Sequence, residues 1–396
     1  MAERIIRAAD AFVTRDPERS GRIVQTLLKA ARTGIIINGD NPQDPKIHDP
    51  LVYSQLLRGS VGLGDSYVAG AWDCKELNTF FYRMLSAEGP LVKTLRAASH
   101  FSPRRLKARF INEQEGEKGK EIGEAHYNRF DPVIQEMLGD TMAYTCGYWE
   151  GLERTPENLD RAQEAKFDLL YRKLGLTSGM KLLDIGCGYG SFAKYAAERG
   201  VTVVGITVSD KQVEQGREFC RGLPVELRTQ DYHDIPKDKK FDAIVSVGMA
   251  EHVGPANFPT YLQIARDHLV DGGKFVLHTI TKEHPGPTNK WIAKEIFPNS
   301  QLPTPSQIKR DAERVGFHVW DDHAFGRDYD PTLMAWWEKS ARYFDQLPDT
   351  EALRRDRRTW EYYLKSCAGA FRAGAMDLNQ FVLSMDSRPA DYEVIR

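Results

Sequence analysis

A carboxylate and an imidazole stand side by side where a strongly apolar stretch of the sequence ends. The stretch Ser246–Phe258, SVGMAEHVGPANF, begins with the pattern of a buried strand and then presents Glu251 and His252. A carboxylate at the rim of an apolar core can act as an acid or a base, because burial and nearby groups shift its pKa. The alternative is a surface carboxylate that caps the following helix. Since adjacent residues after a strand usually point apart, we expect His252 to be structural.

A glycine-rich turn is the second chemical signal. It lies in Leu182–Gly190, LLDIGCGYG, between a short apolar strand and a helical segment. Its glycines recur at every second position, whereas a dinucleotide fingerprint has the spacing G-x-G-x-x-G. The next strand ends GITVSDKQ, without an Asp or Glu directly closing it to hold a ribose. The turn therefore favours a small nucleoside ligand over a dinucleotide.

Polar side chains also follow the next two expected strands. Thr207 and Gln212 come after one of them, and Asp231 and Tyr232 after the other. Ligands of a doubly wound sheet bind at the carboxyl ends of its strands, so these turns converge on one crevice. For Thr207 and Gln212 the alternative is helix capping.

These turns belong to a regular alternation of strands and helices. The pattern predicts βαβ units, a parallel sheet and helices on both faces, which is a doubly wound, Rossmann-like α/β fold. From Lys282 onward a proline-rich stretch and amphipathic helices rich in Trp and Tyr follow as helical insertions. The expected strands are 181–185, 201–207, 225–231, 241–249 and 274–280, and the expected helices between them are 191–200, 209–223 and 258–270.

Composition excludes several classes of protein. Of 396 residues, 41% are hydrophobic and 28% charged, with a net charge of −2 that gives no general attraction to nucleic acid. The five cysteines are odd in number and form no C-x-x-C pair. Neither a signal peptide nor an apolar run of about 18 residues is evident. We therefore expect a soluble, cytoplasmic chain with reduced thiols.

A polar, glycine-containing segment suggests a domain boundary. We expect a smaller, mostly helical N-terminal α/β domain over residues 1–111, a linker over 112–122 and a catalytic domain over 123–396. Between Lys93 and Arg109, cations alternate with Leu and Phe and no acidic residue occurs. This composition suits an anionic membrane surface, but on this stretch alone a solvated helix followed by a linker is the favoured interpretation.

The motifs together resemble the cyclopropane-fatty-acyl-phospholipid synthase family of S-adenosylmethionine-dependent methyltransferases. The resemblance rests on DIGCGYG, GITVS, QDY, SVGMAEHVG and LHTI in this order, and on MAYTCGYW, IFPNSQLP, DYDPTLMAWWE and YYLKSCAGAFR. It implies a methyltransferase sheet and no metal. It also implies S-adenosyl-L-methionine contacts at Tyr144, Thr145, Gly186, Cys187, Gly188, Thr207, Val208, Gln212, Asp231 and Tyr232.

The resemblance also implies a reaction. Methyl transfer to the cis double bond of an unsaturated phospholipid acyl chain leaves a carbocation, and a bound bicarbonate removes a proton so that a cyclopropane ring closes. The implied bicarbonate site comprises Glu251, His278, the backbone of Ile280 and the backbone around Cys146. Without the resemblance, His278 reads as a satisfied core histidine. Cys367 matches a cysteine regarded as an active-site residue, although the reaction needs no thiol and the residue also suits a small apolar filler.

One departure leaves the product open. Trp337 stands where relatives commonly carry Tyr, and an indole N–H can only donate a hydrogen bond. Methyl transfer without ring closure, which gives a methyl-branched or methylene chain, is therefore the alternative reaction. The resemblance further implies a lipid-binding N-terminal domain, peripheral contact with anionic lipid at the inner face of the membrane, and a homodimer.

Two rival functions come from other classes. A noncatalytic lipid-binding protein is disfavoured because the glycine turn, Glu251 and His278 are all present. An NAD-dependent oxidoreductase is disfavoured by the glycine spacing and by the missing acidic residue after the second strand.

Overall fold

The computed structural model describes residues 16–88, 130–254, 256–286, 288–298 and 300–396. The expected linker 112–122 and the basic segment Lys93–Arg109 lie outside these residues, so both stay predictions. Within the described ranges, no helix combines the length and the apolar character needed to cross a bilayer.

A seven-stranded sheet forms the centre of the catalytic part, with the order β5-β4-β3-β6-β7-β9-β8. The five expected strands pair in parallel, and β9 runs antiparallel to both of its neighbours. The Rossmann-like α/β prediction is therefore confirmed, but the last two strands were missed. The strands are β3 (Lys181–Ile185), β4 (Thr202–Thr207), β5 (Val225–Thr229), β6 (Phe241–Val247), β7 (Leu269–Thr281), β8 (His318–Ala324) and β9 (Asp377–Ser384).

Helices cover both faces of the sheet because the strands alternate their apolar side chains. On β3, Leu182 packs under α9 and α10, whereas Leu183 packs under α12 and α14. Ser209 caps α11 by accepting a hydrogen bond from Gln212 N–H. These helices are α9 (Leu159–Leu174), α10 (Ser191–Ala197), α11 (Asp210–Phe219), α12 (Phe258–His268) and α14 (Pro305–Arg314).

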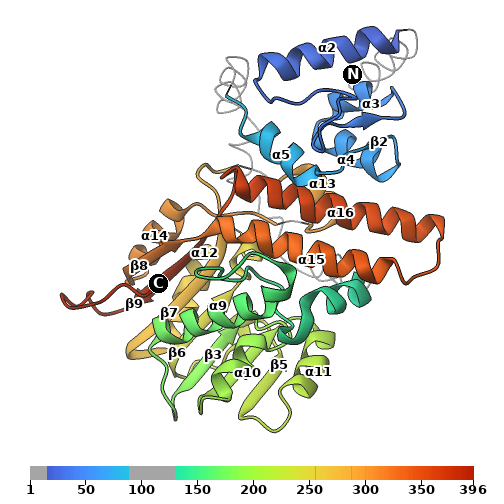
Figure 1. The fold of residues 1–396 in the computed structure, drawn as a ribbon. Helices are drawn as coiled ribbons and strands as arrows, with labels where there is room; N and C mark the ends of the chain where they lie inside the picture. Colours follow the sequence, from blue (N-terminus) through green and yellow to red (C-terminus); the bar gives the residue numbers. More distant parts are fainter. Residues whose placement is uncertain (1–15, 89–129, 255, 287, 299) are drawn as a thin grey trace.

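A helical layer separates the sheet from the N-terminal unit (Figure 1). Two long amphipathic helices, α15 (Tyr329–Phe344) and α16 (Glu351–Arg372), pack together across the carboxyl edge of the sheet, with α13 (Lys290–Glu295) beside them. Residues 130–138 are also helical. Short 3₁₀ turns are η2 (Gly139–Thr141), η3 (Pro156–Asn158), η4 (Tyr232–Asp234), η5 (Ala250–His252) and η6 (Gly326–Asp328).

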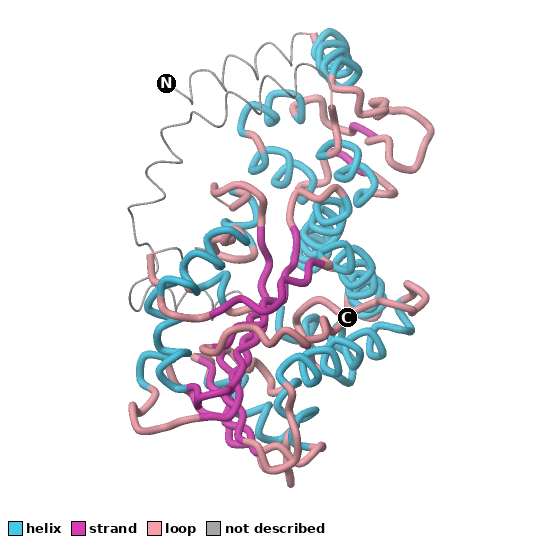
Figure 2. Tube along the Cα trace, turned by 90° about the vertical axis from the view of Figure 1, so that its left-hand side faces the viewer, coloured by secondary structure: helices cyan, strands magenta, loops and turns pink. Residues whose placement is uncertain are grey.

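The N-terminal unit is small and mostly helical, as predicted. Its elements are α2 (Pro17–Ala30), β1 (Lys46–Ile47), α3 (Val52–Gln55), η1 (Leu56–Arg58), α4 (Ser60–Val68), β2 (Trp72–Asp73) and α5 (Leu77–Leu85). Figure 2 shows the unit stacked on the helical layer, away from the strands.

The N-terminal unit shares a hydrophobic core with α16. Tyr67 and Tyr362 place their rings 5.5 Å apart, and both belong to one buried cluster. Arg358 extends from α16 and donates to the backbone carbonyls of Tyr67 (2.7 Å) and Trp72 (2.8 Å). Since buried aromatic area contributes strongly to packing, residues 17–88 are fixed against the catalytic part.

Candidate active site

The glycine turn after β3 has a backbone that side chains rarely adopt. Gly186, Gly188 and Gly190 have φ values of +81°, +54° and +82°, which explains their spacing at every second position. A Cβ on Gly186 would lie 2.7 Å from Cβ of Met249, so this turn closely approaches the turn after β6. Above Gly188 a Cβ would meet nothing within 4 Å, which leaves its backbone open to a ligand.

The turns after β4 and β5 lie at the same sheet edge, as predicted. Thr207 Oγ1 donates to Gln212 Oε1 at 2.9 Å, so these two side chains contact each other. Asp231 accepts a hydrogen bond from His233 N–H at 3.0 Å, while Tyr232 packs edge-on against Tyr261. Of the other predicted cofactor contacts, Cys187 is buried and Val208 is exposed.

The loop before α9 supplies Tyr144 and Thr145, and α9 holds it in place. Lys166 Nζ donates to Thr145 Oγ1 at 2.7 Å, and Gln163 Nε2 donates to the Thr145 carbonyl at 2.7 Å. Burial lowers the pKa of Lys166 to about 7. Sequence reasoning missed these two residues, whose signal is a pair of polar side chains on the apolar face of a helix. The Tyr144 hydroxyl lies 3.2 Å from that of Tyr363 on α16.

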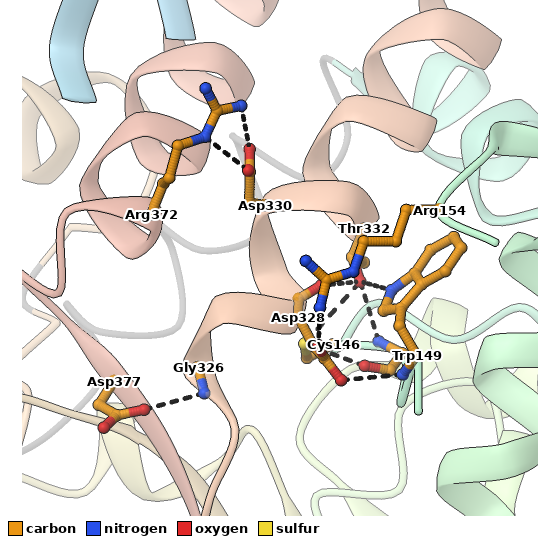
Figure 3. Close-up of polar contacts among 10 residues, drawn as sticks. Cys146, Trp149, Arg154, Gly326, Asp328, Asp330, Thr332, Arg372 and Asp377 are labelled. Atoms are coloured by element: carbon orange, nitrogen blue, oxygen red, sulfur yellow. Dashed lines mark hydrogen bonds and ion pairs between the residues drawn. The ribbon is translucent and has the colours of Figure 1, made fainter. Parts of the chain in front are cut away.

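The start of α15 holds the same loop from the other side (Figure 3). Thr332 Oγ1 accepts hydrogen bonds from Gly147 N–H (3.1 Å) and Trp149 Nε1–H (2.9 Å). Asp328 accepts one from Trp149 N–H at 2.8 Å. Cys146 lies between these contacts with 0% exposure, and burial raises the pKa of its thiol well above the usual value. The thiol is therefore protonated near neutral pH.

Glu251 is buried in η5, directly after β6. Its Oε1 accepts a hydrogen bond from Ile280 N–H at 2.7 Å, and its Oε2 has no partner among the described residues. Burial raises the pKa of Glu251 to about 7, although the Ile280 N–H opposes this shift. The alternative of a surface carboxylate is therefore wrong. His252 is exposed, and its ring lies edge-on to Phe297 with 6.3 Å between the ring centres.

His278 contributes a second unpaired polar atom from β7. The residue has 0% exposure, and its Nδ1 lies 3.1 Å from Gln380 Nε2. Its Nε2 has no hydrogen-bond partner in the ranges that the structure describes. Burial lowers the pKa of His278 well below the usual value, and nearby cationic side chains lower it further. The imidazole is therefore neutral.

Tyr329 is a site residue that the sequence reasoning missed. Burial raises the pKa of its hydroxyl well above the usual value, and the nearby Cys146 and Glu251 raise it further. Trp337 instead lies under the Lys365 ammonium, 4.9 Å from the ring centre. The departure at Trp337 stays a prediction, and Tyr329, eight residues earlier, is an additional tyrosine near Cys146. The signal for it was the DYDPT segment at the start of the helix.

Cys367 lies on α16, in the cluster shared with the N-terminal unit. Burial raises the pKa of its thiol to about 12, which makes the thiolate inaccessible near neutral pH. Its described contacts do not include Glu251 or His278.

Glu251 Oε2 and His278 Nε2 are buried side-chain atoms without a hydrogen-bond partner among the described residues. Buried polar groups are nearly always hydrogen-bonded, so each of the two atoms could bind a small polar ligand. Among the residues that the structure describes, no group of three His, Cys, Asp or Glu side chains is placed to hold a metal ion.

We predict that Glu251→Gln stabilises the protein increasingly as pH rises. The ordinary pKa is 4.5 and the folded value is about 7, so the folded state binds the extra proton and wild type loses stability between these values. Glutamine keeps the acceptor for Ile280 N–H without the charge. The free energy of unfolding of the variant minus that of wild type should therefore be about 3 kcal/mol larger at pH 8 than at pH 4. Thermal unfolding in bicarbonate-free buffer measures the difference.

Glu313→Gln is the matched control, because that side chain is exposed. Its melting temperature relative to wild type should not change with pH. An equally flat difference for Glu251→Gln would contradict the burial of the Glu251 charge.

Comparison with known proteins agrees with this geometry. A family model for mycolic acid cyclopropane synthetase matches residues 114–381. The cyclopropane-fatty-acyl-phospholipid synthase of Escherichia coli (strain K12) is 41% identical over 372 residues, covering 92% of this chain and 93% of that protein. The solved structure of the cyclopropane synthase MmaA2 from Mycobacterium tuberculosis aligns with a TM-score of 0.60 at 31% identity, over 69% of this chain and 99% of that one.

A second solved structure carries ligands. Mycolic acid cyclopropane synthase CmaA1, complexed with SAH and CTAB, aligns with a TM-score of 0.59 at 32% identity and covers 66% of this chain and 96% of that one. These matches argue against the two rival hypotheses, an NAD-dependent oxidoreductase and a noncatalytic lipid-binding protein. The chain belongs to the mycolic acid cyclopropane synthetase family and is an S-adenosylmethionine-dependent methyltransferase.

Proposed function

We propose that this enzyme forms a cyclopropane ring at the cis double bond of an unsaturated phospholipid acyl chain, with a bound bicarbonate as the base. The name of the Escherichia coli relative, a cyclopropane-fatty-acyl-phospholipid synthase, supports the substrate class. The observation that carries the proposal is that Glu251 Oε2 and His278 Nε2, on the adjoining β6–η5 and β7 segments, are both buried without a hydrogen-bond partner among the described residues.

The residues present fit both groups that the reaction requires. The open backbone at Gly188 suits S-adenosylmethionine, and the unpaired atoms of Glu251 and His278 suit a small oxyanion. When bound, the first supplies a methyl cation equivalent and the second supplies a base. The Ile280 and Cys146 backbones complete the oxyanion site in this proposal.

The proposed chemistry requires that water be excluded from the site. The alkene forms a new carbon–carbon bond to the methyl group, S-adenosylhomocysteine leaves, and the positive charge moves to the other alkene carbon. One proton must then leave the new methyl group, so that its C–H electron pair closes the ring and the chain gains one CH2. Water would react with the carbocation, so the surrounding groups must exclude water. They must also supply fixed negative charge that stabilises the carbocation.

Glu251 orients the base in this scheme. Its Oε1 is held by Ile280 N–H, so Oε2 can accept a hydrogen bond from the hydroxyl of bicarbonate. This contact leaves the charged oxygens of the ion directed toward the substrate. Tyr329 is buried close enough to Cys146 and Glu251 for both to raise the pKa of its hydroxyl, so we place it beside the oxyanion in this proposal.

Aromatic rings lie next to the pocket on the side of α15 and α16. Tyr144 packs edge-on against Trp336 at 5.2 Å, and Phe297 packs edge-on against Tyr363 at 5.7 Å. Such a wall gives an acyl chain an apolar surface, and ring faces attract a developing cation. We infer that the double bond lies against these rings.

The N-terminal unit is the proposed membrane contact. Ile23, Leu27, Ile36 and Leu57 are exposed apolar side chains of this unit, and α2 lies at the end of the molecule farthest from the sheet (Figure 1). Cations such as Arg22 accompany them on α2. Apolar side chains with cations suit an anionic lipid surface. Peripheral association at the inner face of the membrane and homodimerisation, which would add avidity, belong to the same proposal.

We predict ring formation on vesicles of monounsaturated phospholipid supplied with methyl-labelled S-adenosylmethionine. Released acyl chains should gain one CH2 by mass spectrometry and show upfield cyclopropane protons by NMR. Glu251→Ala should lower the rate by about 100-fold or more, because the base loses its orientation. His252→Ala is the control, since this neighbouring side chain is exposed.

A labelled chain that keeps its alkene or becomes branched would exclude ring closure and favour plain methylation. Absence of label from lipid, despite binding of S-adenosylhomocysteine, would show that the acceptor is wrong.

A charge placed on α2 should weaken vesicle binding. Ile23→Asp with Leu27→Asp puts two carboxylates on one helical face, so we expect at least about a ten-fold loss of sedimentation with anionic vesicles. Val394→Asp is the control, because Val394 is a comparably exposed apolar residue of the catalytic part. Unchanged sedimentation of the double variant, or an equal loss in the control, would contradict the proposed contact surface.

A further inference from the structure

Gln380 contacts Nδ1 of His278, and the unpaired atom of this imidazole is the other ring nitrogen, Nε2. The two residues are directly paired in the register of β7 and β9, and both have 0% exposure. Directly paired residues project their side chains to the same face, so the sheet itself builds this contact. Gln380 Nε2 is 3.1 Å from His278 Nδ1.

Burial keeps His278 neutral. Burial lowers the pKa of His278 most, and Lys166, Lys173 and His323 lower it further. Lys173 is itself held by Asp321 at 3.2 Å and lies 3.1 Å from His323 Nδ1. A neutral imidazole has one N–H, so its other nitrogen is an acceptor.

The amide orientation decides which nitrogen carries the proton. An amide Nε2 only donates, so the adjacent His278 Nδ1 accepts and the proton resides on Nε2. The reverse orientation would place both amide N–H groups where Gln380 Oε1 now finds no partner among the described residues. Buried N–H groups without a partner are rarer than carbonyls without one, which favours the orientation observed.

We propose that Gln380 is a positioning residue that fixes His278 as the Nε2–H tautomer and so makes the imidazole a hydrogen-bond donor toward the pocket. The identity of the bound anion rests on the proposed function. The tautomer of His278 does not, because it follows from the contact with Gln380. His278 then presents no lone pair to the pocket and cannot remove the substrate proton itself.

The tautomer also determines which anion fits. His278 Nε2–H donates and Glu251 Oε2 accepts, so the pair matches an oxyanion that carries one hydroxyl group. Hydrogencarbonate has this pattern. Nitrate has the same planar shape but no proton, so it leaves Glu251 Oε2 unpaired at a buried position.

Nitrogen NMR of histidine-labelled protein tests the tautomer without turnover. Spectra that correlate ring nitrogens with ring protons distinguish a protonated from an unprotonated nitrogen, and the signal that disappears in His278→Gln assigns the residue. We expect wild type to show an unprotonated Nδ1 and a protonated Nε2. A proton on Nδ1, or a charged imidazole, would overturn the proposal.

Gln380→Glu should reverse this pattern, because a carboxylate accepts from Nδ1–H and moves the lone pair to Nε2. Gln380→Leu should give a mixture of tautomers, and it serves as the second variant if the buried carboxylate prevents folding. Gln346→Glu makes the same change at an exposed site and should leave the His278 signals unaltered. A wild-type pattern in both Gln380 variants would show that Gln380 does not set the tautomer.

Bicarbonate and nitrate dependence separate this inference from the proposed function. Gln380→Glu should raise the bicarbonate concentration for half-maximal rate at least about ten-fold, with an unchanged KM for S-adenosylmethionine, and nitrate should inhibit wild type weakly. If the tautomer reverses but bicarbonate affects neither enzyme, the proposed base fails and the positioning role stands. Equal changes in both KM values would indicate a general structural defect and contradict the positioning role.

Discussion

Glu251 is a carboxyl group that leaves water on folding and recovers one described hydrogen bond, from Ile280 N–H. A buried polar atom left unpaired costs about 1–3 kcal/mol, so the surrounding structure must hold it against relaxation. The pairing of β6 with β7 does this. Gly248 N–H, on the turn that carries Glu251, donates to the carbonyl of His278 at 2.9 Å. The acid and the imidazole are thus fixed to adjacent strands of one rigid sheet.

The helical layer supplies the rest of the pocket from distant parts of the chain. The loop with Cys146 is held by α9 on one side and by the start of α15 on the other. Asp330 then joins α15 to α16 through a two-point ion pair with Arg372 (Figure 3). Since α16 also shares its core with the N-terminal unit, the proposed lipid-contact surface and the proposed active site rest on one helix.

Much of this arrangement was predictable from local sequence, and the rest depended on tertiary contacts. The G-x-G-x-G spacing, the alternation of strands and helices, and the burial of Glu251 after an apolar run all follow from near neighbours. The strand β9 was missed because it lies between two strands and buries polar residues such as Gln380, which break the apolar alternation. Lys166 and Tyr329 were missed because their contacts with the loop of Thr145 and Cys146 join residues 21 or more positions apart in the sequence.

The most direct test of the central claim is a crystal structure of the S-adenosylhomocysteine complex grown with bicarbonate, at a resolution that separates a planar ion from water. We expect planar, three-lobed electron density within hydrogen-bond distance of Glu251 Oε2 and His278 Nε2. This density should be absent from the Glu251→Ala variant. Apolar closure of this space, or a protein side chain that satisfies both atoms, would contradict the account that the interior is built around a bound base.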